Sequence, residues 1–154
     1  MRGVTGRLAV WAAALASLGG VQNVPPDLQA LAAKARVDGM VTAWCRAEFI
    51  PRTKGAFAVA VRASAEGGRY VAIDPDGHSS VLAAFEGDAD LSCYTRDEAR
   101  RLDSTIRRSE TIQGAVRPRW NTTVVCGFVD NTSALCWQYS TTLRRFVEVG
   151  RWTT

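Results

Sequence analysis

The sequence predicts an α+β fold: a mostly antiparallel sheet of about six to seven strands with one or two packed helices, disulfide-stapled. Three observations carry this prediction. Short apolar runs alternate with turn residues, as in an antiparallel meander. One later segment combines helical spacing with a capping box. Four cysteines accompany an N-terminus that is typical of exported chains.

Residues 1–20 have the order of a secretory signal peptide. Arg2 and Arg7 give a basic start, an apolar run from Leu8 to Leu18 follows, and small residues come next. The run is too short to cross a bilayer, which takes about 20 apolar residues. We therefore expect a secreted or periplasmic protein whose mature chain has no transmembrane segment. The alternative is a buried N-terminal helix of a cytoplasmic domain.

The mature chain is expected to be one domain, residues 27–154, after a Pro-containing linker at 21–26. Asp27 can cap a short helix, with Leu28, Leu31, Ala32 and Ala35 on one face. Residues 40–49 stay open between strand and helix, because apolar alternation and helical continuation fit them almost equally well.

A meander is expected next. The turn between its second and third strands is Asp74-Pro75-Asp76-Gly77, which has the residue preferences of a type I turn. The expected strands are Ala56 to Val61, Arg69 to Ile73, Ser80 to Phe85 and Leu91 to Tyr94.

A second helix is expected from Thr95 to about Ser109, because Thr95 and Glu98 form a capping box and Ala99, Leu102 and Ile106 share a face. A hairpin follows, with strands at Thr122 to Val129 and Ala134 to Tyr139 around a polar turn. A last strand is expected at Arg145 to Val149.

The four cysteines are Cys45, Cys93, Cys126 and Cys136, an even number that indicates two disulfides in an exported chain. Sequence alone leaves three pairings open. We favour Cys126–Cys136, which would face each other across the hairpin, together with Cys45–Cys93. A zinc or redox site is disfavoured, because no C-x-x-C pair occurs and the chain has a single histidine.

No recognisable catalytic constellation is present. His78 and Ser79 are neighbours, and neighbours on a strand point to opposite faces, so they do not form a relay. The acidic turn at Asp74 lacks the glycine and glutamate spacing of an EF-hand loop. We therefore predict no catalytic residue, no metal and no cofactor.

Arginines interleaved with aromatic residues in the second half suggest a binding surface. The net charge is +4, and loss of Arg2 and Arg7 with the signal peptide leaves 17 bases against 15 acids. So small a surplus makes nucleic acid an unlikely partner. The candidate surface consists of Arg100, Arg101, Arg107, Arg108, Arg117, Arg119, Trp120, Arg144 and Arg145.

The function expected from these features is that of an exported, disulfide-stabilised binding or interaction module, without catalysis, whose partner is a protein or an anionic envelope polymer. Two alternatives are kept. One is a small secreted hydrolase whose site is assembled only in the fold. The other is an inhibitor of a secreted enzyme.

Overall fold

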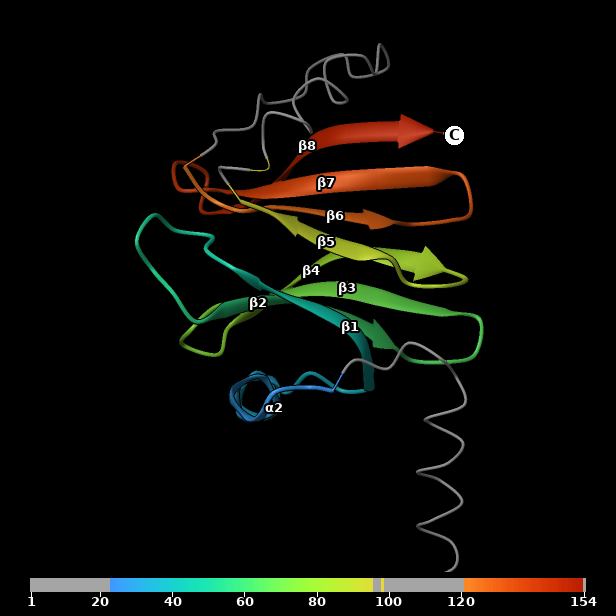
Figure 1. The fold of residues 1–154 in the computed structure, drawn as a ribbon, viewed down its shortest axis with the longest axis horizontal. Helices are drawn as coiled ribbons and strands as arrows, with labels where there is room; N and C mark the ends of the chain where they lie inside the picture. The colour runs from blue at the N-terminus through green and yellow to red at the C-terminus, as the bar shows by residue number, and fades with distance from the viewer. Residues whose placement is uncertain (1–22, 96–97, 99–120, 154) are drawn as a thin grey trace, which may run out of the picture.

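The computed structural model describes residues 23–95, 98 and 121–153. Two four-stranded antiparallel sheets lie face to face, and one short helix covers the outer face of the first sheet (Figure 1). The mostly antiparallel character and the two disulfides agree with the sequence prediction. The number of strands differs, because eight strands are divided between two sheets. No described helix is long and apolar enough to span a membrane.

Each sheet is a simple meander in which consecutive strands are neighbours. The helix α2 (Pro26–Lys34) precedes the first sheet. That sheet consists of β1 (Met40–Ala47), β2 (Ala56–Arg62), β3 (Gly67–Ile73) and β4 (Ser79–Glu86). The second consists of β5 (Leu91–Tyr94), β6 (Val124–Phe128), β7 (Ser133–Ser140) and β8 (Arg145–Thr153).

The central strand β2 is buried on both faces because its two sets of alternating side chains meet different neighbours. Its alanines face the second sheet. In the core between the sheets they pack with Tyr70 and Phe85 of the first sheet and with Trp137 of the second. Its larger side chains face α2. That second cluster consists of Leu28, Phe57, Val59, Val61, Val71 and Ile73.

The helix α2 begins two residues earlier than the sequence predicts. Pro25 is the N-cap residue and Pro26 the first helical residue, a position that suits proline because its missing N–H needs no partner there. Asp27 is therefore not the cap. Its carboxylate instead pairs with Arg46 of β1 at 2.8 Å, and this guanidinium holds the pKa of the Asp27 carboxyl below its ordinary value.

Residues 40–47, the larger part of the segment left open by the sequence, form strand β1. Trp44 packs toward α2, whereas Cys45 packs into the core between the sheets. Gly39 has φ +113 and lies against Val61 and Arg62, so a helix continuing from α2 would have to pass through a left-handed position.

Both favoured disulfides are present. Cys45–Cys93 joins β1 to β5 and so cross-links the two sheets, with a sequence separation of 48. Cys126–Cys136 lies across the β6–β7 hairpin, where the two residues are directly opposed as predicted. It belongs to a third buried cluster with Val124 and Val149.

The helix expected from Thr95 to Ser109 falls almost entirely outside the described residues. Of its capping box, the Glu98 carboxylate accepts a hydrogen bond from the Thr95 backbone N–H at 3.4 Å. This is the interaction that a capping box assigns to its acidic member.

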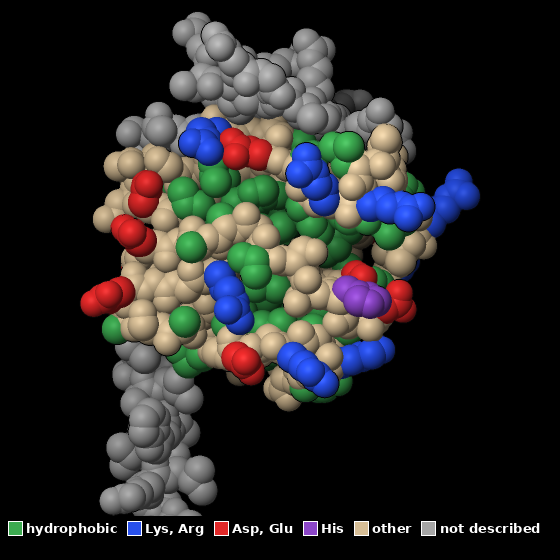
Figure 2. Space-filling view, turned by 180° about the vertical axis from the view of Figure 1, so that it is seen from behind, with side chains coloured by type: hydrophobic (Ala, Val, Ile, Leu, Met, Phe, Trp, Pro, Cys, Tyr) green, Lys and Arg blue, Asp and Glu red, His purple; other side chains and the backbone are tan. Residues whose placement is uncertain are grey.

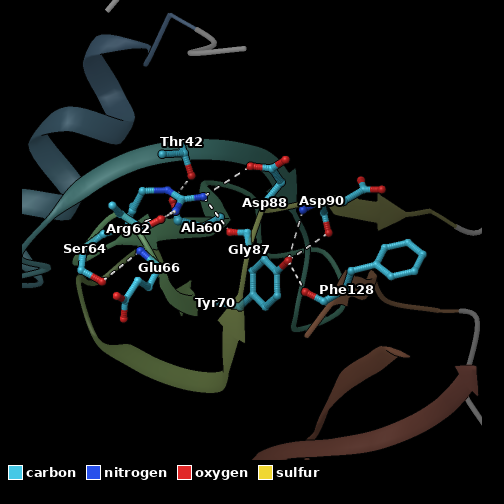
Figure 3. A network of polar contacts seen from close by, with 11 residues as sticks. Thr42, Ala60, Arg62, Ser64, Glu66, Tyr70, Gly87, Asp88, Asp90 and Phe128 are labelled. Carbon is cyan, nitrogen blue, oxygen red and sulfur yellow. Dashed lines mark hydrogen bonds and ion pairs between the residues drawn. The ribbon is translucent and has the colours of Figure 1, made fainter. Parts of the chain in front are cut away.

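Tyr70 joins the two sheets at one end of the sandwich. Its ring is fully buried, and its hydroxyl donates to the Phe128 carbonyl at 2.7 Å and accepts from the Asp90 N–H at 3.2 Å (Figure 3). Burial raises the pKa of Tyr70 to about 12. Gly127 is needed beside it, since a side chain there would meet the ring at 2.7 Å.

We expect Tyr70→Phe to lower the free energy of unfolding by about 1–3 kcal/mol at pH 8, because two buried backbone groups lose their partner. The phenol has a higher pKa in the folded chain than its value of about 10 when unfolded. The wild-type advantage is therefore complete below pH 10 and shrinks as the pH rises toward 12. Urea denaturation of both proteins at pH 8, 10 and 11.5 measures this, and an undiminished advantage at pH 11.5 would contradict it.

Candidate functional site

The connections between strands gather at the two ends of the sandwich. The β1–β2, β3–β4 and β7–β8 connections lie at one end, and the β2–β3, β4–β5 and β6–β7 connections lie at the other (Figure 1). We call the first group the pocket end, because a small cavity opens there between the sheets. Loops held by a rigid sandwich are a common place for binding sites.

The cavity at the pocket end has a volume of about 80 Å³ and an aromatic lining. The ring of Phe146 in β8 meets that of Phe49 edge to face, with 4.9 Å between ring centroids. The ring of Tyr139 in β7 lies 5.3 Å from the Phe146 ring, centroid to centroid. Phe49 and Ala72 are buried, whereas Ile50 is 44% exposed at the rim. The remaining lining residues are Asp74, His78 and Ser80.

Hydrogen bonds hold the β1–β2 connection in place. The Glu48 N–H donates to the Thr123 hydroxyl at 2.8 Å, and the Thr123 N–H donates to the Glu48 carbonyl at 2.9 Å. The Glu48 carboxylate also accepts the Arg52 N–H. Phe49 is therefore fixed between two anchored residues, and the aromatic wall is formed before any ligand arrives.

The β3–β4 turn is organised by Asp74, and the i to i+3 bond of the predicted turn is present, from the Gly77 N–H to the Asp74 carbonyl at 3.0 Å. One carboxylate oxygen accepts the N–H groups of Asp76 and His78, each at 2.9 Å. The other lies 3.1 Å from His78 Nδ1. Gly77 has φ +88, and the stem of Lys34 lies against it.

The polar groups of this turn offer two kinds of chemistry. Ligand atoms of Asp74, Asp76 and His78 lie within 4.8 Å of one another, close enough to surround a cation. The Asp74 oxygens are already engaged by the turn and the imidazole, however. The Asp74–His78 contact also resembles the acid–base half of a catalytic triad, and Ser80 lines the same cavity.

A larger hollow of about 680 Å³ lies toward the opposite end, beside the β2–β3 turn. Its lining includes the backbone of Gly67 and Gly68 and the exposed Glu66. The guanidinium of Arg69 there donates to the Asp38 carbonyl at 3.3 Å. This larger hollow has no aromatic wall comparable to that of the cavity at the pocket end, so we place the candidate site at the pocket end.

Two residues of the predicted arginine surface lie at the pocket end. Arg144 and Arg145 are exposed in the β7–β8 connection and at the start of β8, directly before Phe146 of the cavity wall. The others lie outside the described residues and stay predictions: Arg100, Arg101, Arg107, Arg108, Arg117, Arg119 and Trp120.

The sequence prediction missed the cavity itself. Phe49 and Asp74 come from two separate connections and Phe146 from strand β8, and no spacing in the sequence links them. The sequence predicts the turn at Asp74 but not its place beside the cavity. It offers Ser79 as the neighbour of His78, whereas Ser80 lines the cavity with that histidine.

The chain was compared with protein-family models, with curated proteins and with solved structures, and none of the three comparisons found a match.

We expect Asp74→Ala to lower the free energy of unfolding by about 1 kcal/mol, because two exposed turn N–H groups exchange a carboxylate acceptor for water. His78→Ala should change it by less than about 0.5 kcal/mol, since the His78 side chain is 81% exposed. Urea denaturation of the two variants side by side measures the contrast. Equal losses would show that the imidazole contact, and not the backbone contacts, holds the turn.

Proposed function

We propose that this protein is an exported, disulfide-stabilised binding module that seats one apolar side chain of a partner protein in the cavity at the pocket end. The observation that carries the proposal is the cavity of about 80 Å³ between Phe49 and Phe146. Cavities that bury a whole small-molecule ligand usually measure about 300–1,000 Å³. This one suits a single side chain, as in the anchor pockets of protein interfaces.

The surroundings of the cavity support a protein partner over an envelope polymer. Sugar rings would need exposed aromatic faces, but Phe49 is only 5% exposed and lies edge to face against Phe146. Ile50 and Leu143 are exposed large apolar residues of the β1–β2 and β7–β8 connections, at 44% and 53%. They offer further contact area for a docked segment around the anchor.

Export is supported by two independent features. The Cys45–Cys93 and Cys126–Cys136 disulfides are typical of an oxidising compartment. Residues 1–20, which lie outside the described part of the chain, have the pattern of a signal peptide.

The matched pair Ser80→Phe and Ser79→Phe tests the anchor cavity. Both serines are exposed neighbours on β4, but successive residues of a strand face opposite ways, so only Ser80→Phe fills the cavity. As the probe we take N-acetyl-leucinamide, with N-acetyl-serinamide as its polar control. At about −0.3 kcal/mol per heavy atom, the leucine probe should bind with a millimolar Kd.

We expect the leucine probe to shift the amide NMR signals of Phe49, Ala72 and Phe146 in the wild type and in Ser79→Phe. Ser80→Phe should abolish these shifts, and the serine probe should cause none. Equal responses to the two probes, or shifts that survive Ser80→Phe, would refute the anchor cavity.

A second candidate is hydrolysis, favoured by the 3.1 Å contact between Asp74 and His78 Nδ1 beside Ser80. In that case Ser80 would attack an acyl group, His78 would take its proton, and water would release the acid. A fluorophosphonate probe followed by mass spectrometry separates the two candidates. The binding module predicts an unmodified chain. An adduct on Ser80 that disappears in His78→Ala would establish the hydrolase instead.

A further inference from the structure

Charged side chains divide between the two ends of the sandwich. Several Lys and Arg side chains lie on the side that carries the histidine, where acidic side chains lie directly beside it, and further acidic side chains lie along the opposite edge (Figure 2). The bases of the pocket end are Lys34, Arg52, Lys54, Arg144 and Arg145. The acids in and beside the connections of the other end are Glu66, Glu86, Asp88, Asp90 and Asp130.

Two of the three acids in the connections of the pocket end are bound within those connections, whereas the Asp76 carboxylate is exposed. Asp74 is held by its turn and His78, and the Glu48 carboxylate accepts the Arg52 N–H. The bases are different. Arg144 and Arg145 are exposed, and neither side chain forms an ion pair within the described part of the chain.

The opposite end uses the guanidinium of Arg62 internally. Arg62 donates to the carbonyls of Ala65 at 3.0 Å and Gly87 at 2.7 Å (Figure 3). Asp88, 3.8 Å from this guanidinium, remains fully exposed. The Asp130 carboxylate accepts the N–H groups of Thr132 and Ser133, and these bonds lower the pKa of Asp130. Negative charge is therefore retained at that end over the whole neutral range.

We infer that the partner segment seated at the pocket end is acidic, with carboxylates on both sides of the apolar anchor. This inference rests on the proposed function and adds the charge of the partner. Unpaired bases around an apolar cavity attract carboxylates, and they repel segments that carry Lys or Arg. The attraction acts at the rim, so it should weaken as salt screens it.

Three peptides serve as probes: acidic Ac-Glu-Asp-Leu-Asp-Glu-NH2, its neutral counterpart Ac-Gln-Asn-Leu-Asn-Gln-NH2, and basic Ac-Lys-Lys-Leu-Lys-Lys-NH2. They share the leucine anchor and differ in charge. We expect the acidic peptide to bind the pocket end at least 10-fold more tightly than the neutral one at 20 mM salt. The basic peptide should bind more weakly than both. At 500 mM salt the three should converge.

The double variant Arg144→Glu with Arg145→Glu should remove the advantage of the acidic peptide and leave the neutral peptide unaffected. Arg36→Glu with Arg151→Glu is the control. It changes the net charge equally, but both residues are exposed and lie outside the three connections of the pocket end. Amide NMR titration gives both the affinity and the place of binding.

Each outcome decides something different. Equal affinity for the acidic and neutral peptides, or equal loss in the two double variants, overturns the acidic partner but leaves the anchor cavity standing. Failure of all three peptides to shift the signals of the pocket end overturns both proposals. In the absence of any peptide, amide NMR shifts at both ends that depend on protein concentration would show that a second copy of this chain occupies the pocket end with its opposite, acidic end. That result also overturns a separate acidic partner.

Discussion

The spacing between the two sheets depends on the alternation of small and large side chains along β2. Stacked sheets lie about 10 Å apart, and the side chains of both inner faces must share that space. The alanines at 56, 58 and 60 leave room for the rings of Tyr70, Phe85 and Trp137, while Phe57, Val59 and Val61 fill the space beneath α2. A larger residue at Ala58 would force the sheets apart, and the cavity at the pocket end would change with them.

The two ends of the sandwich are closed in different ways. At the end opposite the pocket end, the Tyr70 hydroxyl donates to the Phe128 carbonyl and the Arg62 guanidinium donates to the Gly87 carbonyl. These side chains and backbone carbonyls are therefore hydrogen-bonded to each other. At the pocket end, Phe49, Tyr139 and Phe146 meet as rings, and flat rings at these angles leave a hollow. The same core therefore has polar contacts between the sheets at one end and an aromatic-lined cavity at the other.

Local features of this fold could be predicted from the sequence, but the division into two sheets could not. The Asp74 turn and the hairpin register follow from turn chemistry and residue spacing. The hairpin favours the Cys126–Cys136 disulfide, and Cys45–Cys93 is then the pair that remains. The run of apolar residues in β2 shows that both its faces are buried. It does not show that a helix covers one face and a second sheet the other.

The site was less predictable than the fold, because its parts are joined only by packing. Arg144 and Arg145 were selected as arginines near an aromatic residue, and Phe146 beside them lines the cavity. Phe49 carries no comparable signal, since its position depends on Thr123, 74 residues further along the chain. A distance of that kind leaves no pattern in one sequence.

The order in which the protein acquires its disulfides follows from the topology. Each sheet is a meander of neighbouring strands, so most contacts within a sheet are local and form early in folding. Cys126 and Cys136 are brought together by a single hairpin. Cys45 and Cys93 belong to different sheets and meet only when the sheets dock. The Cys45–Cys93 disulfide therefore requires docking of the two sheets, whereas the Cys126–Cys136 disulfide requires only the hairpin.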